Sequence, residues 1–311
     1  MSKIESLVLQ YVTLDDPRGI RLRQPEILNE FYHRDTRDDL IEIGCDLGKL
    51  RRGNDARMLD ALDLFQQPMM QAVQHTHDRD YPIQPCIRLP EPSLSDRPLR
   101  ETLGARRSVR SFSGAPLGVS DLGSLLFGAI GETGRLITTF EDGRPIEASL
   151  RTIPSAGALH PTGIFVIIIQ DGELTTGIYH YDVPEHSLEF VRPLSDRDFG
   201  ALFAAFPIHP QVVDIRQAAA LFFISSKFWR ARAKYGPRGY RYCVLEAGCA
   251  CQNLGLTAVA LGLGHVVIGG FYDDEIHSYL DIDGVDHAVI TAMAIGSMRD
   301  ERAEGSDDGQ L

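Results

Sequence analysis

The hydrophobic positions near the start of the chain follow a helical spacing. Four apolar side chains follow Pro25 in this way, and proline favours the first turn of a helix. A second helix is predicted at residues 56–67, where leucines form an apolar face, and Pro68 is expected to end it. The sequence therefore predicts a mostly helical N-terminal region, residues 1–95, which ends in a proline-rich connection.

The pattern changes further along the chain. Residues 164–170 form a nearly continuous apolar run rich in β-branched side chains, which is typical of a strand buried on both faces. A long apolar helix is predicted at residues 239–261, and a shorter one begins with Ser120 as its N-cap. Further strands are predicted at residues 178–181, 188–191, 219–225, 266–268 and 288–294. This order favours an α+β fold with a central mixed sheet enclosed by helices. The main domain is expected at residues 96–300, followed by a flexible tail at 301–311.

The composition narrows the classes of function. The 311 residues carry a formal net charge of −12, which argues against nucleic acid as a partner. Five cysteines at irregular spacing argue against a disulfide framework, and the first fifteen residues lack the pattern of a signal peptide, so a cytoplasmic location is expected. Cys249 and Cys251 have no second pair at zinc spacing, so no metal site is predicted. Polar residues interrupt the apolar stretch 244–263, which favours a core helix over a membrane span.

Three separated segments have residue types suited to a flat cofactor that bears a phosphate. Three arginines with a serine offer charge-assisted hydrogen bonds to a phosphate, although such a run is also typical of a solvated surface. Small residues before the 164–170 strand allow close approach of a ring, and two glycines after a later strand can present N–H groups, although both also fit ordinary turns. The candidates are Arg106, Arg107, Ser108, Arg110, Pro154, Ser155, Ala156, Gly157, Gly269 and Gly270.

In this order the three segments resemble the nitroreductase superfamily. The strings Pro-Ser-Ala-Gly-Ala-Leu-His-Pro at 154–161 and Lys-Tyr-Gly-Pro-Arg-Gly-Tyr-Arg-Tyr-Cys-Val-Leu-Glu-Ala-Gly at 234–248 are similar to its SagB-type dehydrogenases, which include oxidases of thiazole- and oxazole-modified microcins and cyanobactins. The resemblance covers about residues 99–297. It implies an FMN-binding catalytic domain of nitroreductase-like fold, in which FMN lies at a homodimer interface.

The resemblance also assigns roles to the candidate residues. The arginines and serine of residues 106–110 would contact the FMN phosphate and ribityl chain. Residues 154–157 would line the ring, with Gly269 and Gly270 near its N5 edge. Two departures stand out: Ala158 occupies a position where general nitroreductases often have Asn, and Arg299 is the candidate for their basic residue near the C-terminus.

Residues 227–241 contain six cations, four aromatic side chains and no acid. A stacking surface for nucleic acid and a solvated loop are both open alternatives. The sharper hypothesis is that like charges and burial lower the pKa of Lys234, while nearby cations favour the tyrosinate form of Tyr235. Either residue would then serve as a general base. In SagB-type enzymes a Lys-Tyr pair at this motif position is the proposed catalytic element.

The resemblance therefore implies an FMN-dependent dehydrogenase that oxidises thiazoline or oxazoline rings to thiazole or oxazole in a peptide or carrier-bound precursor. Lys234 or Tyr235 would remove a proton, and a hydride would pass to flavin N5. A cyclodehydratase or another biosynthetic enzyme is the expected partner, besides the peptide or small-molecule azoline substrate. Two alternatives stay open: an NAD(P)H-dependent reductase of nitro, quinone or enone compounds on the same FMN, and an inactive scaffold in a biosynthetic complex.

Overall fold

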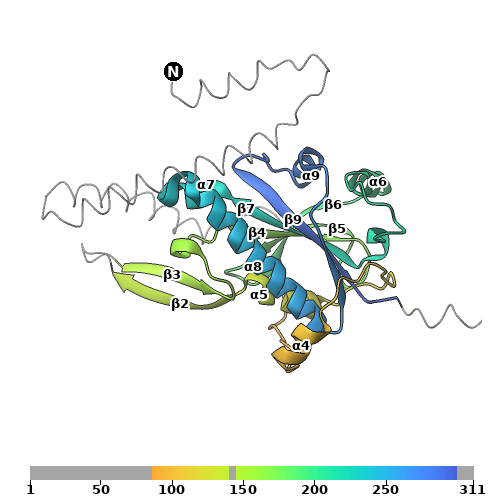
Figure 1. Cartoon of the computed structure of the whole chain (residues 1–311), viewed down its shortest axis with the longest axis horizontal. Helices are drawn as coiled ribbons and strands as arrows, with labels where there is room; N and C mark the ends of the chain where they lie inside the picture. Colours follow the sequence, from red (N-terminus) through yellow and green to blue (C-terminus); the bar gives the residue numbers. More distant parts are fainter. Residues whose placement is uncertain (1–85, 140–144, 300–311) are drawn as a thin grey trace, which may run out of the picture. The chain divides into compact units, whose positions relative to one another are not determined.

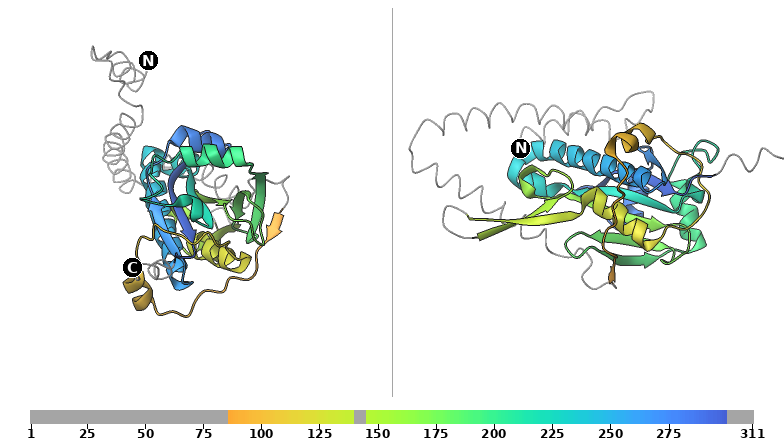
Figure 2. Two further views of the ribbon diagram at one scale, coloured as in Figure 1. Left: turned by 90° about the vertical axis from the view of Figure 1, so that its right-hand side faces the viewer. Right: turned by 90° about the horizontal axis from the view of Figure 1, so that it is seen from below.

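The computed structural model describes residues 86–139 and 145–299, and in this part an antiparallel sheet lies between two layers of helices (Figures 1 and 2). The sheet has seven strands in the order β1-β6-β5-β4-β7-β9-β8. Its strands are β1 (Cys86–Arg88), β4 (Thr162–Ile168), β5 (Gly177–Asp182), β6 (Ser187–Pro193), β7 (Ala220–Lys227), β8 (Gly264–Ile268) and β9 (His287–Gly296). The predicted α+β class is confirmed.

The strand directions differ from the expected mixed sheet. Every ladder between neighbouring strands is antiparallel. The sequence run β4-β5-β6 is joined by short connections, which suit antiparallel neighbours, whereas parallel strands need long crossovers. The parallel pairing described at the sheet is an isolated bridge between Ser108 and His265 beside β8. The mixed-sheet prediction is therefore corrected to an antiparallel sheet with this one parallel bridge.

Helices cover both faces of the sheet. One core cluster joins the sheet to α5 (Val119–Ile130) and α8 (Gly239–Ala260), and the other joins it to α6 (Asp196–Ala204) and α9 (Asp273–Leu280). The helix α8 ends within one residue of its predicted limits. The start of α5 differs from the prediction, because Gly118 is its N-cap and Ser120 lies inside the helix.

The helical segment Phe228–Ala260, which includes α8, is the one described segment long and apolar enough to cross a membrane by length and composition. The same test is passed by core helices of globular domains. Buried side chains of α8, among them Leu254 and Ala258, belong to the core cluster that also contains strands β4 and β7. Packing against the sheet therefore accounts for the apolar composition of α8.

Several elements did not stand out in the hydrophobic pattern. The strands β2 (Glu132–Thr139) and β3 (Pro145–Arg151) form a separate hairpin, which Figure 2 shows projecting from the main sheet. The cationic stretch after β7 forms α7 (Phe228–Tyr235) and a short turn, η4 (Gly236–Arg238), which leads directly into α8. A short helix, α4 (Leu99–Ala105), precedes the predicted phosphate-binding arginines.

The predicted N-terminal region lies mostly outside the described residues. Its last part contributes the edge strand β1, whose residue Ile87 pairs with Leu188 of β6. The helices predicted near Pro25 and at 56–67, and the tail at 301–311, fall outside the described residues. The boundary at residue 95 stays a prediction.

Candidate active site

The loop at residues 154–161 connects the β2–β3 hairpin to β4 and has a strained backbone. Gly157, Ala158 and His160 have φ values of 64°, 54° and 45°, a left-handed region that residues other than glycine rarely adopt. Side chains hold this shape: the Ser155 hydroxyl accepts a hydrogen bond from the His160 N–H at 2.9 Å. The His160 ring contacts the carbonyl of Ser149 at 2.8 Å. Strain held in place by surrounding groups is characteristic of functional sites.

The same loop meets the Lys-Tyr pair at the end of α7. A Cβ atom added to Gly157 would lie 2.8 Å from Lys234 Nζ and 2.8 Å from the Tyr235 hydroxyl. A side chain at residue 157 would displace the ends of both side chains, and the positive φ of Gly157 is one that glycine tolerates. Two segments that the sequence analysis selected independently therefore come together in space.

The electrostatics of the pair favour lysine as the base. Burial lowers the pKa of the half-buried Lys234. Burial, together with the neighbouring Tyr242, raises the pKa of Tyr235. The expectation that surrounding cations would favour the Tyr235 tyrosinate is therefore wrong, because desolvation of the phenolate dominates. The expected contribution of like charge to Lys234 is not found either, since burial is the cause of its shift.

The arginine segment, residues 106–110, lies elsewhere, beside the edge strand β8. The N–H of Val109 donates to the carbonyl of His265 at 2.8 Å. The side chains of Arg107 and Arg110 are exposed and donate only to nearby carbonyls of their own stretch of chain. None of the three arginines forms an ion pair with a described acid. In a chain of net charge −12, such unpaired arginines suit a phosphate.

Further features beside β8 are consistent with a bound phosphate compound. Gly269 and Gly270 follow β8 directly, and a Cβ added to either would meet nothing within 4 Å. Their exposed backbone is thus open to a ligand. The N–H of Arg299 donates to the carbonyl of Ser111 at 3.4 Å, so this cation lies next to the arginine segment.

The predicted cofactor residues therefore fall into two groups in one chain. Residues 154–157 lie with Lys234 and Tyr235 at the α7 end of α8, and the arginine segment lies at its α4 end (Figure 1). Ser155 lies beside Glu246 of α8, whereas His265 packs on Gly255. These two positions are about 13 Å apart along the helix axis. Among the described residues no hydrogen bond or ion pair joins the two groups.

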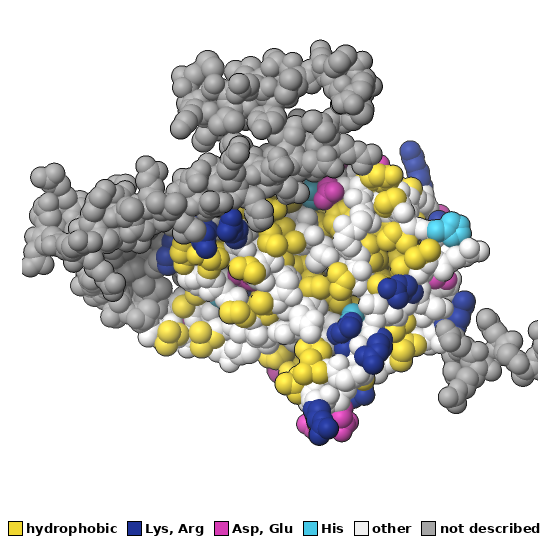
Figure 3. All heavy atoms as spheres, viewed as in Figure 1, with side chains coloured by type: hydrophobic (Ala, Val, Ile, Leu, Met, Phe, Trp, Pro, Cys, Tyr) yellow, Lys and Arg dark blue, Asp and Glu magenta, His cyan; other side chains and the backbone are white. Residues whose placement is uncertain are grey.

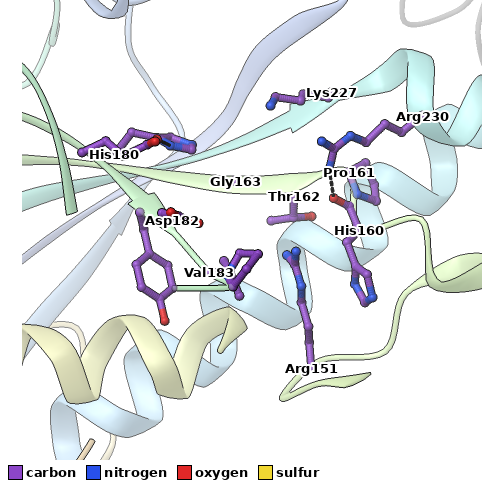
Figure 4. A pocket seen from close by; sticks show the side chains of 13 residues that line it. Arg151, His160, Pro161, Thr162, Gly163, His180, Asp182, Val183, Lys227 and Arg230 are labelled. Atoms are coloured by element: carbon purple, nitrogen blue, oxygen red, sulfur yellow. Dashed lines mark hydrogen bonds and ion pairs between the residues drawn. The ribbon is translucent and has the colours of Figure 1, made fainter. Parts of the chain in front are cut away.

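A small cavity of about 40 Å³ lies behind the 154–161 loop (Figure 4). The labelled side chains of Arg151, Lys227 and Arg230 line it, and Asp182 from β5 and Glu189 from β6 face the same space. Ligand pockets usually measure hundreds of Å³, so this cavity suits a few water molecules and not a flavin ring. It forms a charged backing to the loop.

Sequence reasoning missed two charged residues beside the loop, Glu246 and Arg151. Glu246 on α8 is 4% exposed, and its Oε1 accepts from the N–H of Thr162 at 3.4 Å. Burial lowers the pKa of Arg151 to about 10, while the charge of Glu246 opposes this shift. The available signal was a single carboxylate in an otherwise apolar helix, which requires a buried partner.

Comparison with known proteins identifies the family. The model of the Nitroreductase family matches residues 103–297. A Methanocaldococcus jannaschii protein named as a nitroreductase, MJ1384, is 35% identical over 61% of this chain and 88% of its own length. The microcin B17-processing protein McbC of Escherichia coli is 26% identical over 49% of this chain, and the trifolitoxin-processing protein TfxB of Rhizobium leguminosarum is 25% identical over 47%. The chain spans 56% of McbC and 39% of TfxB.

Solved structures share the fold. A nitroreductase-like protein of Ralstonia eutropha superposes with a TM-score of 0.54 at 24% identity, covering 69% of this chain and 90% of that one. The E. coli microcin synthetase complex McbBCD with truncated pro-MccB17 contains a chain that superposes with a TM-score of 0.53 at 19% identity, covering 82% and 98%.

The unpaired arginines, the open glycine backbone and the strained loop of small residues fit FMN, the cofactor of this family. The arginine segment with Arg299 would hold its phosphate, and residues 154–157 would line its ring. The chain is thus an FMN-dependent oxidoreductase; it belongs to the nitroreductase family and resembles, within it, the SagB-type branch.

Proposed function

We propose that this protein is a dehydrogenase that oxidises thiazoline or oxazoline rings to thiazole or oxazole in a peptide or carrier-bound precursor. The observation that carries the proposal is the meeting of Lys234 Nζ and the Tyr235 hydroxyl at Gly157, each 2.8 Å from the position of an added Cβ. A reductase supplied with hydride by a nicotinamide needs no such base. A dehydrogenase that removes a C–H proton does.

Lys234 is the base in this proposal. Its amine is half-buried and its pKa is lowered, so a larger fraction is neutral near pH 7 than for a solvated lysine. The pKa of Tyr235 is raised, so its hydroxyl stays protonated and can donate a hydrogen bond to a ring heteroatom. Bound FMN supplies the hydride acceptor. The two side chains orient the azoline, and Lys234 Nζ takes the proton.

A second copy of the chain would complete the site. The two groups of cofactor residues lie at opposite ends of α8 without contact, which supports a homodimer in which each FMN touches both chains. The exposed face of α8 supports the same proposal, because Val244 and Leu245 are 38% and 66% exposed. In Figure 3 basic side chains gather toward α7 and toward α4, with hydrophobic patches between them. Leu245→Asp should yield a monomer that has lost FMN, as judged by light scattering and absorbance.

The relatives support the proposed class of substrate. McbC and TfxB are named for processing microcin B17 and trifolitoxin, and the McbBCD structure holds a truncated precursor. We infer a peptide or small-molecule azoline as substrate, and a cyclodehydratase or a similar ring-forming enzyme as partner. The acidic net charge is consistent with the absence of nucleic acid from this list. A cytoplasmic location, where FMN is made available, completes the proposal.

The test is the oxidation of a synthetic thiazoline-containing peptide by the FMN-loaded protein in air. The expected product has lost two hydrogens, detected by mass spectrometry and by the ultraviolet absorbance of the thiazole. The reductase alternative is favoured by the likeness to a protein named as a nitroreductase. It predicts oxidation of NAD(P)H with a nitro compound and no thiazole. A protein that stays colourless in the presence of FMN would support the inactive scaffold.

A further inference from the structure

The carboxylate of Glu246 lies beneath the 154–161 loop, at the point where the loop enters β4. Its Oε1 accepts from the backbone N–H of Thr162, the first residue after the loop, at 3.4 Å. The Ser155 hydroxyl lies near enough to the carboxylate to lower its pKa. We propose that Glu246 is a positioning residue, which fixes this loop against Lys234 and Tyr235 and so sets the place of the flavin ring. This inference rests on the proposed function, because it gives the loop its role as the wall of the flavin site.

Ser155 is the link through which Glu246 acts. Its hydroxyl lowers the pKa of the nearby carboxylate and accepts a hydrogen bond from the N–H of His160 at 2.9 Å. The hydroxyl is therefore committed to the protein interior, and Ser155 offers its backbone to a ligand. Between the two bonded residues lie Gly157 and Ala158, both with positive φ. Such a backbone keeps its shape only while its flanks are held.

The charge of Glu246 has a partner at a distance. The pKa of Glu246 is raised by burial, while the hydrogen bonds from Ser155 and Thr162 and the charge of Arg151 oppose that shift. Within the part of the chain that the structure describes, neither Glu246 Oε2 nor Arg151 Nε has a hydrogen-bond partner. The two side chains therefore attract each other without forming a direct ion pair, and among the described residues the carboxylate is hydrogen bonded to the N–H of Thr162. A buried carboxylate without such contacts would be strongly unfavourable.

The same helix provides a matched control. Leu254 of α8 is fully buried in the core cluster shared with the sheet and has no role in the loop. Glu246→Ala removes the acceptor, whereas Glu246→Gln keeps a carbonyl oxygen of similar reach. Ser155→Ala removes the link. Leu254→Ala leaves a cavity in the same helix and thus reports general destabilisation.

The first readout is hydrogen–deuterium exchange of the peptide that spans residues 155–162, which requires no cofactor. Glu246→Ala and Ser155→Ala are expected to raise its exchange, and Glu246→Gln and Leu254→Ala to leave it near that of the wild type. The second readout is FMN binding, followed by flavin fluorescence and by visible circular dichroism of the bound ring. Glu246→Ala should weaken FMN about tenfold, as expected for a lost hydrogen bond to a charged group, and Gln should restore most of the affinity.

Each outcome bears on the inference. The double variant Glu246→Ala with Ser155→Ala tests whether Glu246 acts through Ser155. If its exchange and its FMN affinity equal those of Glu246→Ala alone, Glu246 acts through Ser155, as proposed. Three results would overturn the inference. They are unchanged exchange in Glu246→Ala, a loss of FMN affinity in Glu246→Gln equal to that in Glu246→Ala, and exchange in Leu254→Ala as high as in Glu246→Ala. If exchange rises as expected but the wild-type protein takes up no FMN, Glu246 positions the loop and the proposed function fails instead.

Discussion

The two ends of α8 represent two ways of building a binding site. At the α7 end, the 154–161 loop is strained, and buried side chains such as Glu246 hold it in place. At the α4 end, Arg107 and Arg110 are exposed and form no ion pair with an acid of residues 86–139 or 145–299. At the α7 end the protein holds the loop geometry without a ligand. At the α4 end it supplies positively charged side chains that become ordered when a ligand binds. Chemistry that depends on a base at a set distance belongs at the first end, and anchoring a phosphate belongs at the second.

The largest expected effect is on the rate of oxidation, from a substitution of Lys234 at the α7 end of α8. Lys234→Met should lower the rate of azoline oxidation by about 10²–10⁴-fold, the usual contribution of a general base, while FMN stays bound. The measurement is the single-turnover rate of thiazole formation. The matched control is Arg232→Met on the same helix, an exposed cation whose nearest acid is Asp286 at 3.8 Å. Equal losses in both variants would show that positive charge, and not a base, is what matters here.

The dependence on pH follows from the same lysine. Its pKa in the folded protein is lowered, so the neutral amine forms as pH rises through a value below the ordinary one of about 10.4. Activity should therefore rise about tenfold per pH unit below that pKa and level off above it. The folded state binds fewer protons than the unfolded chain in this window, so Lys234 also makes the protein less stable as pH falls through it. An alkaline limb that persists in Lys234→Met would assign the titration to another group.

Substitutions at the α4 end of α8, where the FMN phosphate would be anchored, should lower the affinity for FMN and not the rate of the chemical step. Replacing Arg107 with Gln should weaken FMN about tenfold, the loss expected for one charge-assisted hydrogen bond. Riboflavin, which lacks the phosphate, should bind wild type and variant alike in a fluorescence titration. Arg100 on α4 is exposed in the same region, and Arg100→Gln serves as the control. A parallel loss of riboflavin affinity would place Arg107 at the ring or in the fold, not at the phosphate.

The smallest effect concerns the strain in the loop. Gly157→Ala adds a Cβ at a positive φ and close to two side chains, so it should lower the free energy of unfolding by about 1–3 kcal/mol. Gly200 on α6 has open space around its Cβ position. Gly200→Ala should therefore raise stability by about 0.5–1 kcal/mol. Thermal denaturation of both variants measures the contrast. A Gly157→Ala protein as stable as wild type would remove the argument for a glycine at this contact.

The sequence predicted the core of the fold well, because burial leaves a strong pattern. The limits of α8 and of the strands β4, β7 and β9 follow apolar runs, because these segments are buried in the core. The β2–β3 hairpin was not expected, because its apolar residues Leu136 and Ile137 are 54% and 72% exposed and it contributes nothing to the main core. The mixed strand directions were wrong because buried strands in parallel and antiparallel sheets can share the same apolar pattern.

The sequence predicted which residues belong to the candidate site better than it predicted their burial and their contacts. Motif strings pointed to Gly157, Lys234 and Tyr235, and the structure brings these three together. The protonation preference of Tyr235 was predicted in the wrong direction, since burial outweighs the neighbouring cations. Glu246 was missed because its importance lies in a contact with Thr162, 84 positions away, which no local pattern encodes.

The most direct test of the account is anaerobic mixing of the FMN-loaded protein with a thiazoline peptide, without any nicotinamide, while the visible flavin absorbance is followed. The account predicts that the oxidised flavin band bleaches with one thiazole formed per flavin, that air restores it, and that Lys234→Met abolishes the bleaching. A flavin that stays oxidised with the azoline and bleaches with NAD(P)H would contradict the account and make the protein a reductase.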